Sequence, residues 1–257
     1  MTAKPRWDPA QYERFSGHRL RPALDLLNAV NLAEPKAIAD LGCGNGTVTA
    51  LLRERWPGAA VTGIDSSAEM LERARAVDDV VTWQEGDVGA WCPAGEDLVF
   101  SNAALHWLDD HESLFTGLVD RLKPGSVLAV QMPDNFDQAS HQALRDASDD
   151  EAWCDRLAPA AGRRPVASPE KYFQWLRPRV KSLDIWQTTY LQALHGPDAV
   201  FEWIKGAAMR PLLGLLSEDE RGRFEDMCRE ALNAAYPPGD DGRTLFPFRR
   251  LFIVAVK

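Results

Sequence analysis

The residues of this chain that could do chemistry gather around one glycine-rich stretch, D-L-G-C-G-N-G at residues 40–46. Gly42 and Gly44 allow the backbone positive φ angles and let a ligand lie against the main chain without a Cβ in the way. Asp65 follows 21 positions after Gly44, and a carboxylate there can accept both ribose hydroxyls of an adenosine. With Asp87 as a further acid, the pattern predicts a nucleotide-binding site.

The spacing of the glycines limits which nucleotide fits. A dinucleotide fingerprint reads G-x-G-x-x-G, but counted from Gly42 its last position falls on Thr47. No Lys-Ser or Lys-Thr pair follows the loop, which argues against a phosphate-binding P-loop. A nicotinamide enzyme also gives no reason to expect Asp87. The pattern therefore disfavours a nicotinamide dehydrogenase, an alternative that nicotinamide binding in a cofactor titration would revive.

The elements that must position these residues alternate between strand and helix from Lys36 to Met132. Such alternation is typical of a parallel sheet covered by helices on both faces, with ligands beyond the C-terminal ends of the strands. The predicted strands cover residues 37–41, 60–64, 80–85, 97–102 and 126–132. The polar residues at their ends are Asp40, Asp65, Asp87 and Asn102. The pattern that forms the sheet and the pattern that forms the site therefore agree.

The rest of the chain surrounds this alternating region. Ser217-x-x-Glu220 is a capping box that predicts the start of a helix, and apolar runs near the end of the chain predict further strands. We expect a single domain over residues 1–257, with an N-terminal helical cap (1–35), a cofactor-binding core (36–132), helical cap insertions (133–178 and 196–240) and the last strands (180–191 and 249–256).

Composition excludes several classes of function. The net charge of −9 and a pI near 5.1 argue against a nucleic-acid partner, which requires a basic face. The four cysteines form no C-x-x-C pair, so we expect no metal site, no disulfide framework and a reducing compartment. The N-terminus has no apolar core of signal-peptide length, and no run approaches the about 18 residues of a membrane span. The chain is therefore predicted to be cytoplasmic, without a membrane partner.

The segment after Asn102, N-A-A-L-H-W, lies where chemistry would occur if the predicted site is correct. His106 has the residue type of a general base, but a packing or hydrogen-bonding role is also open, and we favour the latter. Trp107 is interpreted as a pocket wall, with cover for the sheet edge as the alternative.

The order of these markers resembles the class I S-adenosylmethionine-dependent methyltransferases. Two further stretches, D-L-V-F-S-N at 97–102 and L-K-P-G at 122–125, belong to the same pattern, which covers roughly the first half of the chain. The resemblance implies an α/β, Rossmann-like class I methyltransferase fold. Its sheet would be mostly parallel and seven-stranded, with helices on both faces and a helical cap over the site. It also implies S-adenosyl-L-methionine as cofactor and S-adenosyl-L-homocysteine as product.

The resemblance assigns roles to particular residues. Asp40 and the backbone of Gly42 and Gly44 would hold the methionine end of the cofactor, and Asp65 would bind the ribose. The remaining cofactor-binding candidates are Ser66, Asp87 and the backbone of Val88 at the adenine, and Asn102. Each marker alone has a plainer explanation, since a glycine turn is often only a turn and Ser66-x-x-Glu69 also fits a helix capping box.

Several stretches from end to end of the chain are similar to one family within this class, the trans-aconitate 2-methyltransferases. They are W-D-P at 7–9 with Tyr12, R-P at 21–22, A-D-L-G-C-G at 39–44, T-G-I-D-S-S at 62–67, L-A-V-Q-M-P-D-N at 128–135, D-I-W at 184–186, T-T-Y at 188–190, R-P at 210–211 and R-L-F-I-V-A at 250–255. This resemblance implies methyl transfer to one carboxylate of trans-aconitate, giving a monomethyl ester.

A tricarboxylic acid that binds to an acidic protein requires concentrated positive charge. Arginine suits this role because its two parallel N–H donors match the two oxygens of a carboxylate. The candidates are Arg19, Arg21, Arg210, Arg249 and Arg250, with Tyr12, Trp107 and Tyr190 as walls or donors. Arg21, Arg210 and Arg250 rank first because they lie in the matching stretches, although Arg19 and Arg21 are equally consistent with solvated surface charge. No general base is required, because a carboxylate is already an anion at neutral pH.

Three alternatives stay open. The chain could methylate a malonyl group on an acyl carrier protein, although an acidic carrier would require a basic docking patch that the sequence does not show. It could be another small-molecule carboxyl or O-methyltransferase. It could also bind adenosylmethionine without catalysis, and such a protein would have no use for an arginine-lined second pocket. For the oligomeric state we expect a monomer or a weak homo-oligomer.

Overall fold

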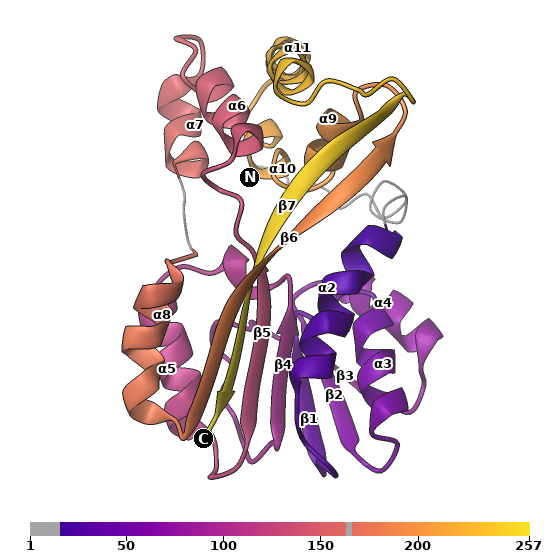
Figure 1. Cartoon of the computed structure of the whole chain (residues 1–257), viewed down its shortest axis with the longest axis vertical. Helices are drawn as coiled ribbons and strands as arrows, with labels where there is room; N and C mark the ends of the chain where they lie inside the picture. The colour runs from indigo at the N-terminus through magenta and orange to yellow at the C-terminus, as the bar shows by residue number, and fades with distance from the viewer. Residues whose placement is uncertain (1–15, 163–165) are drawn as a thin grey trace. The chain divides into compact units, whose positions relative to one another are not determined.

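The computed structural model describes residues 16–162 and 166–257, with side chains from Leu20 onwards. Within this part of the chain, a seven-stranded sheet has the order β3-β2-β1-β4-β5-β7-β6 (Figure 1). The strands are β1 (Ala37–Leu41), β2 (Ala60–Asp65), β3 (Thr82–Glu85), β4 (Leu98–Asn102), β5 (Val127–Pro133), β6 (Ser182–His195) and β7 (Arg243–Val256). The pairs among β1 to β5 are parallel, and β5 pairs with β7 in the antiparallel direction. The predicted Rossmann-like, mostly parallel seven-stranded sheet is confirmed.

The described chain forms two compact units. Among the described residues, the sheet unit holds 20–133, 166–188 and 250–257, and the helical unit holds 16–19, 134–162 and 189–249. Strands β6 and β7 each contribute residues to both units. The single-domain organisation expected from the sequence therefore stays a prediction.

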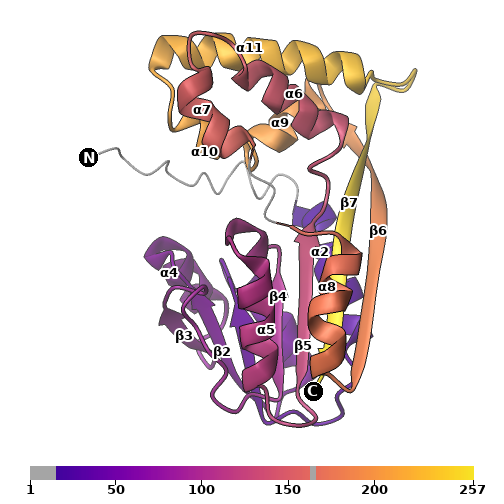
Figure 2. The ribbon, with the colours of Figure 1, turned by 90° about the vertical axis from the view of Figure 1, so that its left-hand side faces the viewer.

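Helices cover both faces of the sheet in the sheet unit (Figures 1 and 2). They are α2 (Ser16–Ala29), α3 (Thr47–Arg55), α4 (Ala68–Val77), α5 (His111–Arg121) and α8 (Pro169–Leu176), with short 3₁₀ turns η1 (Leu105–Trp107) and η2 (Arg177–Arg179). Phe115 of α5 and Tyr172 of α8 pack with Val130 of β5 in one buried cluster. On α2, Ala23, Leu26 and Leu27 recur at helical spacing and are buried.

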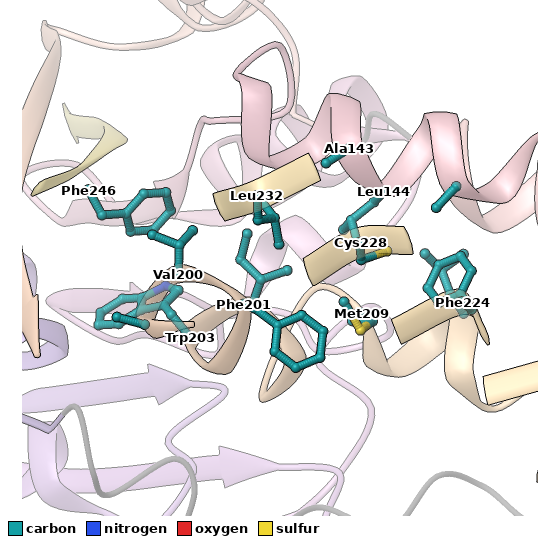
Figure 3. Packing of buried hydrophobic residues seen from close by; sticks show 14 of the residues in the cluster. Ala143, Leu144, Val200, Phe201, Trp203, Met209, Phe224, Cys228, Leu232 and Phe246 are labelled. Carbon is teal, nitrogen blue, oxygen red and sulfur yellow. The ribbon is translucent and has the colours of Figure 1, made fainter. Parts of the chain in front are cut away.

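The helical unit has its own hydrophobic core, shown in Figure 3. Its helices are α6 (Ala139–Ser148), α7 (Cys154–Ala161), α9 (Ala199–Lys205), α10 (Arg210–Leu213) and α11 (Glu218–Ala235). The predicted capping box at the start of α11 is confirmed, because Ser217 and Glu220 exchange side-chain and backbone hydrogen bonds. Phe224 and Cys228 of α11 pack with Phe201 of α9 in the core (Figure 3).

Three boundaries differ from the expectation. The strand expected at 180–191 continues to His195, and the strand expected at 249–256 already begins at Arg243. Pro247 lies inside this last strand, and a proline normally argues against a strand. The segment expected as a helical cap at 133–178 is divided, because α8 packs against α5 in the sheet unit.

Across the described residues, the structure has no helix that is both long and apolar enough to cross a membrane.

Candidate functional site

The glycine loop joins the end of β1 to α3, with a different constraint at each glycine. Gly42 has a φ of 73°, and a Cβ added there would lie 2.1 Å from the Cβ of Ala104. Gly44 has a φ of 55°, but a Cβ added there would meet no described atom within 4 Å. Gly42 is therefore required by packing inside the protein, whereas Gly44 has open space beside it, as a ligand-binding backbone requires.

Asp65 at the end of β2 is linked directly to this loop. Its Oδ2 accepts a hydrogen bond from the backbone N–H of Gly44 at 2.8 Å, and its Oδ1 accepts one from Ser67 at 2.9 Å. A carboxylate has about four lone-pair sites, so Asp65 retains acceptor capacity for hydroxyl groups. The two residues that the sequence separated by 21 positions therefore meet at the predicted edge of the sheet.

Helix α4 begins one residue later than the capping box considered at Ser66 suggested. The N-cap of α4 is Ser67, whose side chain accepts from the backbone N–H of Met70 at 3.3 Å. Ser66 is exposed beside Asp65. The capping box at Ser66-x-x-Glu69 was therefore wrong by one residue.

Asp40 is a buried carboxyl group below the loop, with only 1% of its surface exposed. The hydroxyl of Thr49, in the first turn of α3, donates to its Oδ2 at 2.6 Å. Burial raises the pKa of Asp40 from 3.8 to about 7; the hydrogen bond from Thr49 opposes this increase, and the charge of Asp65 adds to it. Asp40 thus joins β1 to the start of α3 and can change charge near neutral pH.

Asp87 and Val88 follow β3. Asp87 is exposed, and its Oδ1 accepts from the backbone N–H of Gly89 at 2.8 Å, which fixes the turn. Val88 is half-buried and packs against the buried cluster of the sheet unit. Asp87 and Val88 therefore lie just after the end of β3, where the sequence predicted them.

The chain turns sharply after β4. Ala103 has a φ of 53°, which is unusual for a residue with a Cβ, and its N–H donates to the carbonyl of Gln131 at 2.9 Å. The ring of His106 lies 4.7 Å from the ring of Trp107, and Trp107 is 44% exposed, so Trp107 is outside the buried core. The carbonyl of Leu105 accepts from Nε2 of the buried His111 at 3.1 Å, which holds this turn in place.

Gln131 on β5 is a residue whose importance the sequence reasoning missed. Its side chain is fully buried, and neither amide atom has a hydrogen-bond partner within residues 16–162 and 166–257. The available signal was a single amide inside an otherwise apolar strand.

The predicted substrate residues are distributed over both units. Tyr12 lies outside the described residues, as does the side chain of Arg19. In the sheet unit, Arg21 is exposed on α2, and Arg250 on β7 is only 5% exposed. In the helical unit, Tyr190 on β6 is buried, and Arg210 begins α10.

Arg249, another arginine candidate from the sequence, bonds to two carboxylates of its own unit. Its Nε donates to the backbone oxygen of Asp134 at 2.7 Å and to Oδ2 of the same residue at 3.1 Å, and its Nη2 donates to Asp137 at 2.6 Å. The hydrogen bond with Asp137, followed by the charges of both carboxylates, raises the pKa of Arg249. Its charge is therefore neutralised inside the helical unit.

Comparisons with known proteins agree with this arrangement. A family model described as a methyltransferase domain matches residues 38–125. The trans-aconitate 2-methyltransferase of Azoarcus sp. (strain BH72) is 46% identical over 98% of this chain and 100% of its own length. The enzymes of the same name from Streptomyces coelicolor and from Pseudomonas aeruginosa strain UCBPP-PA14 are 45% and 43% identical, over 98% and 97% of this chain and 87% and 94% of their own lengths.

Solved structures share the fold at much lower identity. The YcgJ protein from Bacillus subtilis superposes with a TM-score of 0.57 at 16% identity, over 94% of this chain and 98% of its own. The Haemonchus contortus phosphoethanolamine N-methyltransferase 2, in complex with S-adenosyl-L-methionine, gives a TM-score of 0.52 at 17% identity, over 92% of this chain and 52% of its own.

Proposed function

The chain belongs to the trans-aconitate 2-methyltransferase family, and on this basis we propose that it transfers the methyl group of S-adenosyl-L-methionine to one carboxylate of trans-aconitate. The products are a monomethyl ester and S-adenosyl-L-homocysteine. The observation that carries the proposal is the 46% identity to a relative of that name over 98% of this chain, since the match includes the helical unit as well as the glycine loop.

The residues at the strand ends fit the cofactor. The open space beside Gly44 lets a ligand approach the backbone, and Asp65 has acceptor capacity for two ribose hydroxyls. Asp87 and the Val88 backbone bind the adenine edge in this proposal. The remaining members of the proposed cofactor set are Asp40, Gly42, Ser66 and Asn102. The cofactor supplies a methyl group on a sulfonium, and the bonding electron pair stays with sulfur when the methyl passes to a carboxylate oxygen.

We propose that arginine side chains bind the carboxylates of trans-aconitate. A trianion is stabilised by guanidinium groups in poorly solvated positions, and Arg250, at 5% exposure, is the most buried of the proposed arginines with a described side chain. Arg21 and Arg210 are the other arginines ranked first from the sequence. Tyr12, Arg19, Trp107 and Tyr190 complete the proposed set of substrate residues.

The chain's own contribution to the reaction is positioning. The acceptor carboxylate, with a pKa of about 4, is an anion at neutral pH, so no side chain has to remove a proton. Holding the carboxylate oxygen in line with the methyl–sulfur bond can lower the barrier by about 7 to 11 kcal/mol. His106, beside Trp107, is therefore assigned a packing role rather than that of a base.

The proposal extends to organisation and location. We propose a single functional domain over residues 1–257 that acts in the cytoplasm as a monomer or a weak homo-oligomer. Its partner is a small acid rather than a nucleic acid, consistent with the net charge of −9.

The experiment that tests the reaction uses adenosylmethionine with a ¹³C-labelled methyl group. The purified protein is incubated with this cofactor and trans-aconitate, and the product is examined by NMR. The expected result is a labelled methyl ester in an amount equal to the adenosylhomocysteine formed. Tight cofactor binding without any ester from trans-aconitate or a related acid would favour the non-catalytic alternative.

A further inference from the structure

Gln131 has a buried side-chain amide that requires a partner. It is 0% exposed, and both Nε2 and Oε1 have no hydrogen-bond partner in the described part of the chain. Leaving a buried polar group without a hydrogen bond destabilises the folded state, so such groups are rare in native proteins. Since Gln131 lies near the C-terminal end of β5, where open α/β sheets bind ligands, a bound reactant can supply the missing bonds.

A second amide lies beside it. Asn102, at the end of β4, is the register partner of Gln131, so the two side chains project from the same face of the sheet. Oδ1 of Asn102 is also buried and has no hydrogen-bond partner among the described residues. The bond from Ala103 N–H to the Gln131 carbonyl fixes the backbone of both strands at this point.

A cationic side chain lies on the other side of Gln131. On β7, Phe252 is its register partner, and Arg250 lies two residues from Phe252, opposite Pro133. Side chains alternate along a strand, so Arg250 projects from the same face as Phe252 and Gln131. The ring of Phe252 stacks on Trp186 at 4.7 Å and 7°, which orients this part of the strand. Gln131 is therefore placed between Arg250 and Asn102.

We propose that the Gln131 carboxamide is a positioning residue that contacts both reactants, an inference that rests on the proposed function. Nε2 donates a hydrogen bond to an oxygen of the acceptor carboxylate, on the Arg250 side. Oε1, together with Oδ1 of Asn102, faces the cationic methionine end of the cofactor.

The chemistry of the reactants explains why an amide fits. A fully ionised tricarboxylic acid only accepts hydrogen bonds, whereas the ammonium group of the methionine end only donates them. A carboxamide provides a donor and an acceptor at fixed separation, which no carboxylate or aliphatic side chain does. A glutamate at this position would repel the acid.

Asn135 and Gln192 also have buried amides without a hydrogen-bond partner in the described residues, but both belong to the helical unit. Neither has a register pairing that places it beside a second unpartnered amide at the end of a parallel strand. Gln131 is therefore the amide that the sheet geometry assigns to the reactants.

The test compares Gln131→Leu, Gln131→Glu and the wild type, with Met132→Leu as a matched control. Met132 is the next residue of β5, and its side chain packs into the buried cluster on the opposite face. Four quantities are measured for each protein: Tm without ligands, Kd for adenosylmethionine by calorimetry, and kcat and KM for trans-aconitate.

For Gln131→Leu we expect an unchanged or higher Tm, at least tenfold weaker cofactor binding and at least a hundredfold lower kcat/KM. For Gln131→Glu we expect a cofactor Kd within threefold of wild type or tighter, and a KM for the acid at least tenfold higher. Met132→Leu should stay within threefold in both ligand measurements.

A purely structural role for Gln131 predicts the reverse, namely a lower Tm of Gln131→Leu with Kd and kcat/KM within threefold of wild type, and this result would overturn the inference. If the wild type makes no ester, the proposed function fails. An unchanged cofactor Kd in Gln131→Leu would then overturn the inference separately.

Discussion

The backbone N–H of Gly44 donates a hydrogen bond to Oδ2 of Asp65 at 2.8 Å, although 21 positions separate the two residues in sequence. One carboxylate thus holds the glycine loop at the end of β2, while its remaining lone pairs stay available to a ligand. This bond supplements those from the N–H groups of Gly42 and Cys43 to the carbonyl of Ile64, but it is the one that involves a proposed ribose-binding group. Removing the carboxylate therefore affects both halves of the proposed cofactor site.

Asp65→Ala should weaken adenosylmethionine binding by a few kcal/mol. The variant loses charge-assisted hydrogen bonds to the ribose, worth about 1.5 to 3 kcal/mol each, as well as the support of the loop. Calorimetric titration measures the effect. Asp79→Ala, which removes an exposed acid elsewhere in the same unit, is the control and should leave Kd unchanged. Equal affinity in Asp65→Ala and wild type would contradict the ribose assignment.

Alanine at Gly42 should mainly affect stability, whereas alanine at Gly44 should mainly affect cofactor binding. Gly42→Ala forces a Cβ to within 2.1 Å of the Cβ of Ala104, so we expect a loss of several kcal/mol in the free energy of unfolding. Gly44→Ala meets only the cost of a positive φ, about 1 to 2 kcal/mol, but places a methyl group in the open space beside the loop.

Urea unfolding and cofactor titration of both variants check this pair of predictions. Gly44→Ala should weaken cofactor binding by more than tenfold while it remains folded. A Gly44→Ala protein with the affinity of wild type would show that the cofactor does not lie against this residue.

The stability of the protein should depend on pH through Asp40. Its pKa is raised from 3.8 to about 7 in the folded state, so between about pH 4 and pH 7 the folded protein holds a proton that the unfolded chain has released. The free energy of unfolding therefore falls as the pH rises through this window. Asp40→Asn cannot titrate, so its stability relative to wild type should increase from pH 4 to pH 8, by up to roughly 4 kcal/mol at 1.36 kcal/mol per pKa unit.

Urea unfolding of both proteins at pH 4, 6 and 8 measures this difference. A constant difference between Asp40→Asn and wild type at all three values would mean that the pKa of Asp40 is ordinary in the folded state.

Two adjacent arginines should behave differently. Arg250→Ala should lower kcat/KM for trans-aconitate by at least a hundredfold and leave cofactor affinity within threefold, since a proposed carboxylate partner is lost. Arg249→Ala should lower Tm, because its bonds to Asp134 and Asp137 hold the helical unit together, but kcat/KM per folded protein should stay within threefold. Steady-state kinetics and thermal unfolding distinguish the two, and a larger kinetic loss in Arg249→Ala would reverse the assignment.

The site residues that the sequence predicted are those that lie in short local patterns. An acid and two glycines between an apolar strand and a helix identify Asp40, Gly42 and Gly44, and the next strand end identifies Asp65. Strand-helix alternation with these markers was sufficient for β1, β2, β4 and β5, because these strands are largely apolar and alternate with helices.

The features that the sequence did not predict depend on contacts between segments that are distant along the chain. Arg249 and Arg250 are neighbours in sequence, but side chains alternate along a strand, and the pairing of β7 with β5 had to be known to assign their faces. Gln131 is an amide in an apolar strand, and its unsatisfied state is visible only when its neighbours are placed. The early start of β7 at Arg243 was hidden by Pro247.

The substrate preference of the wild-type protein tests the proposed function most sharply. Transfer of labelled methyl from adenosylmethionine is measured for trans-aconitate, cis-aconitate, citrate, isocitrate and a malonyl-carrier conjugate under the same conditions. We expect the highest kcat/KM for trans-aconitate, at least tenfold above every other acceptor, with a methyl ester as product. A higher kcat/KM for the malonyl-carrier conjugate would contradict it and would identify the chain as a carrier-dependent methyltransferase.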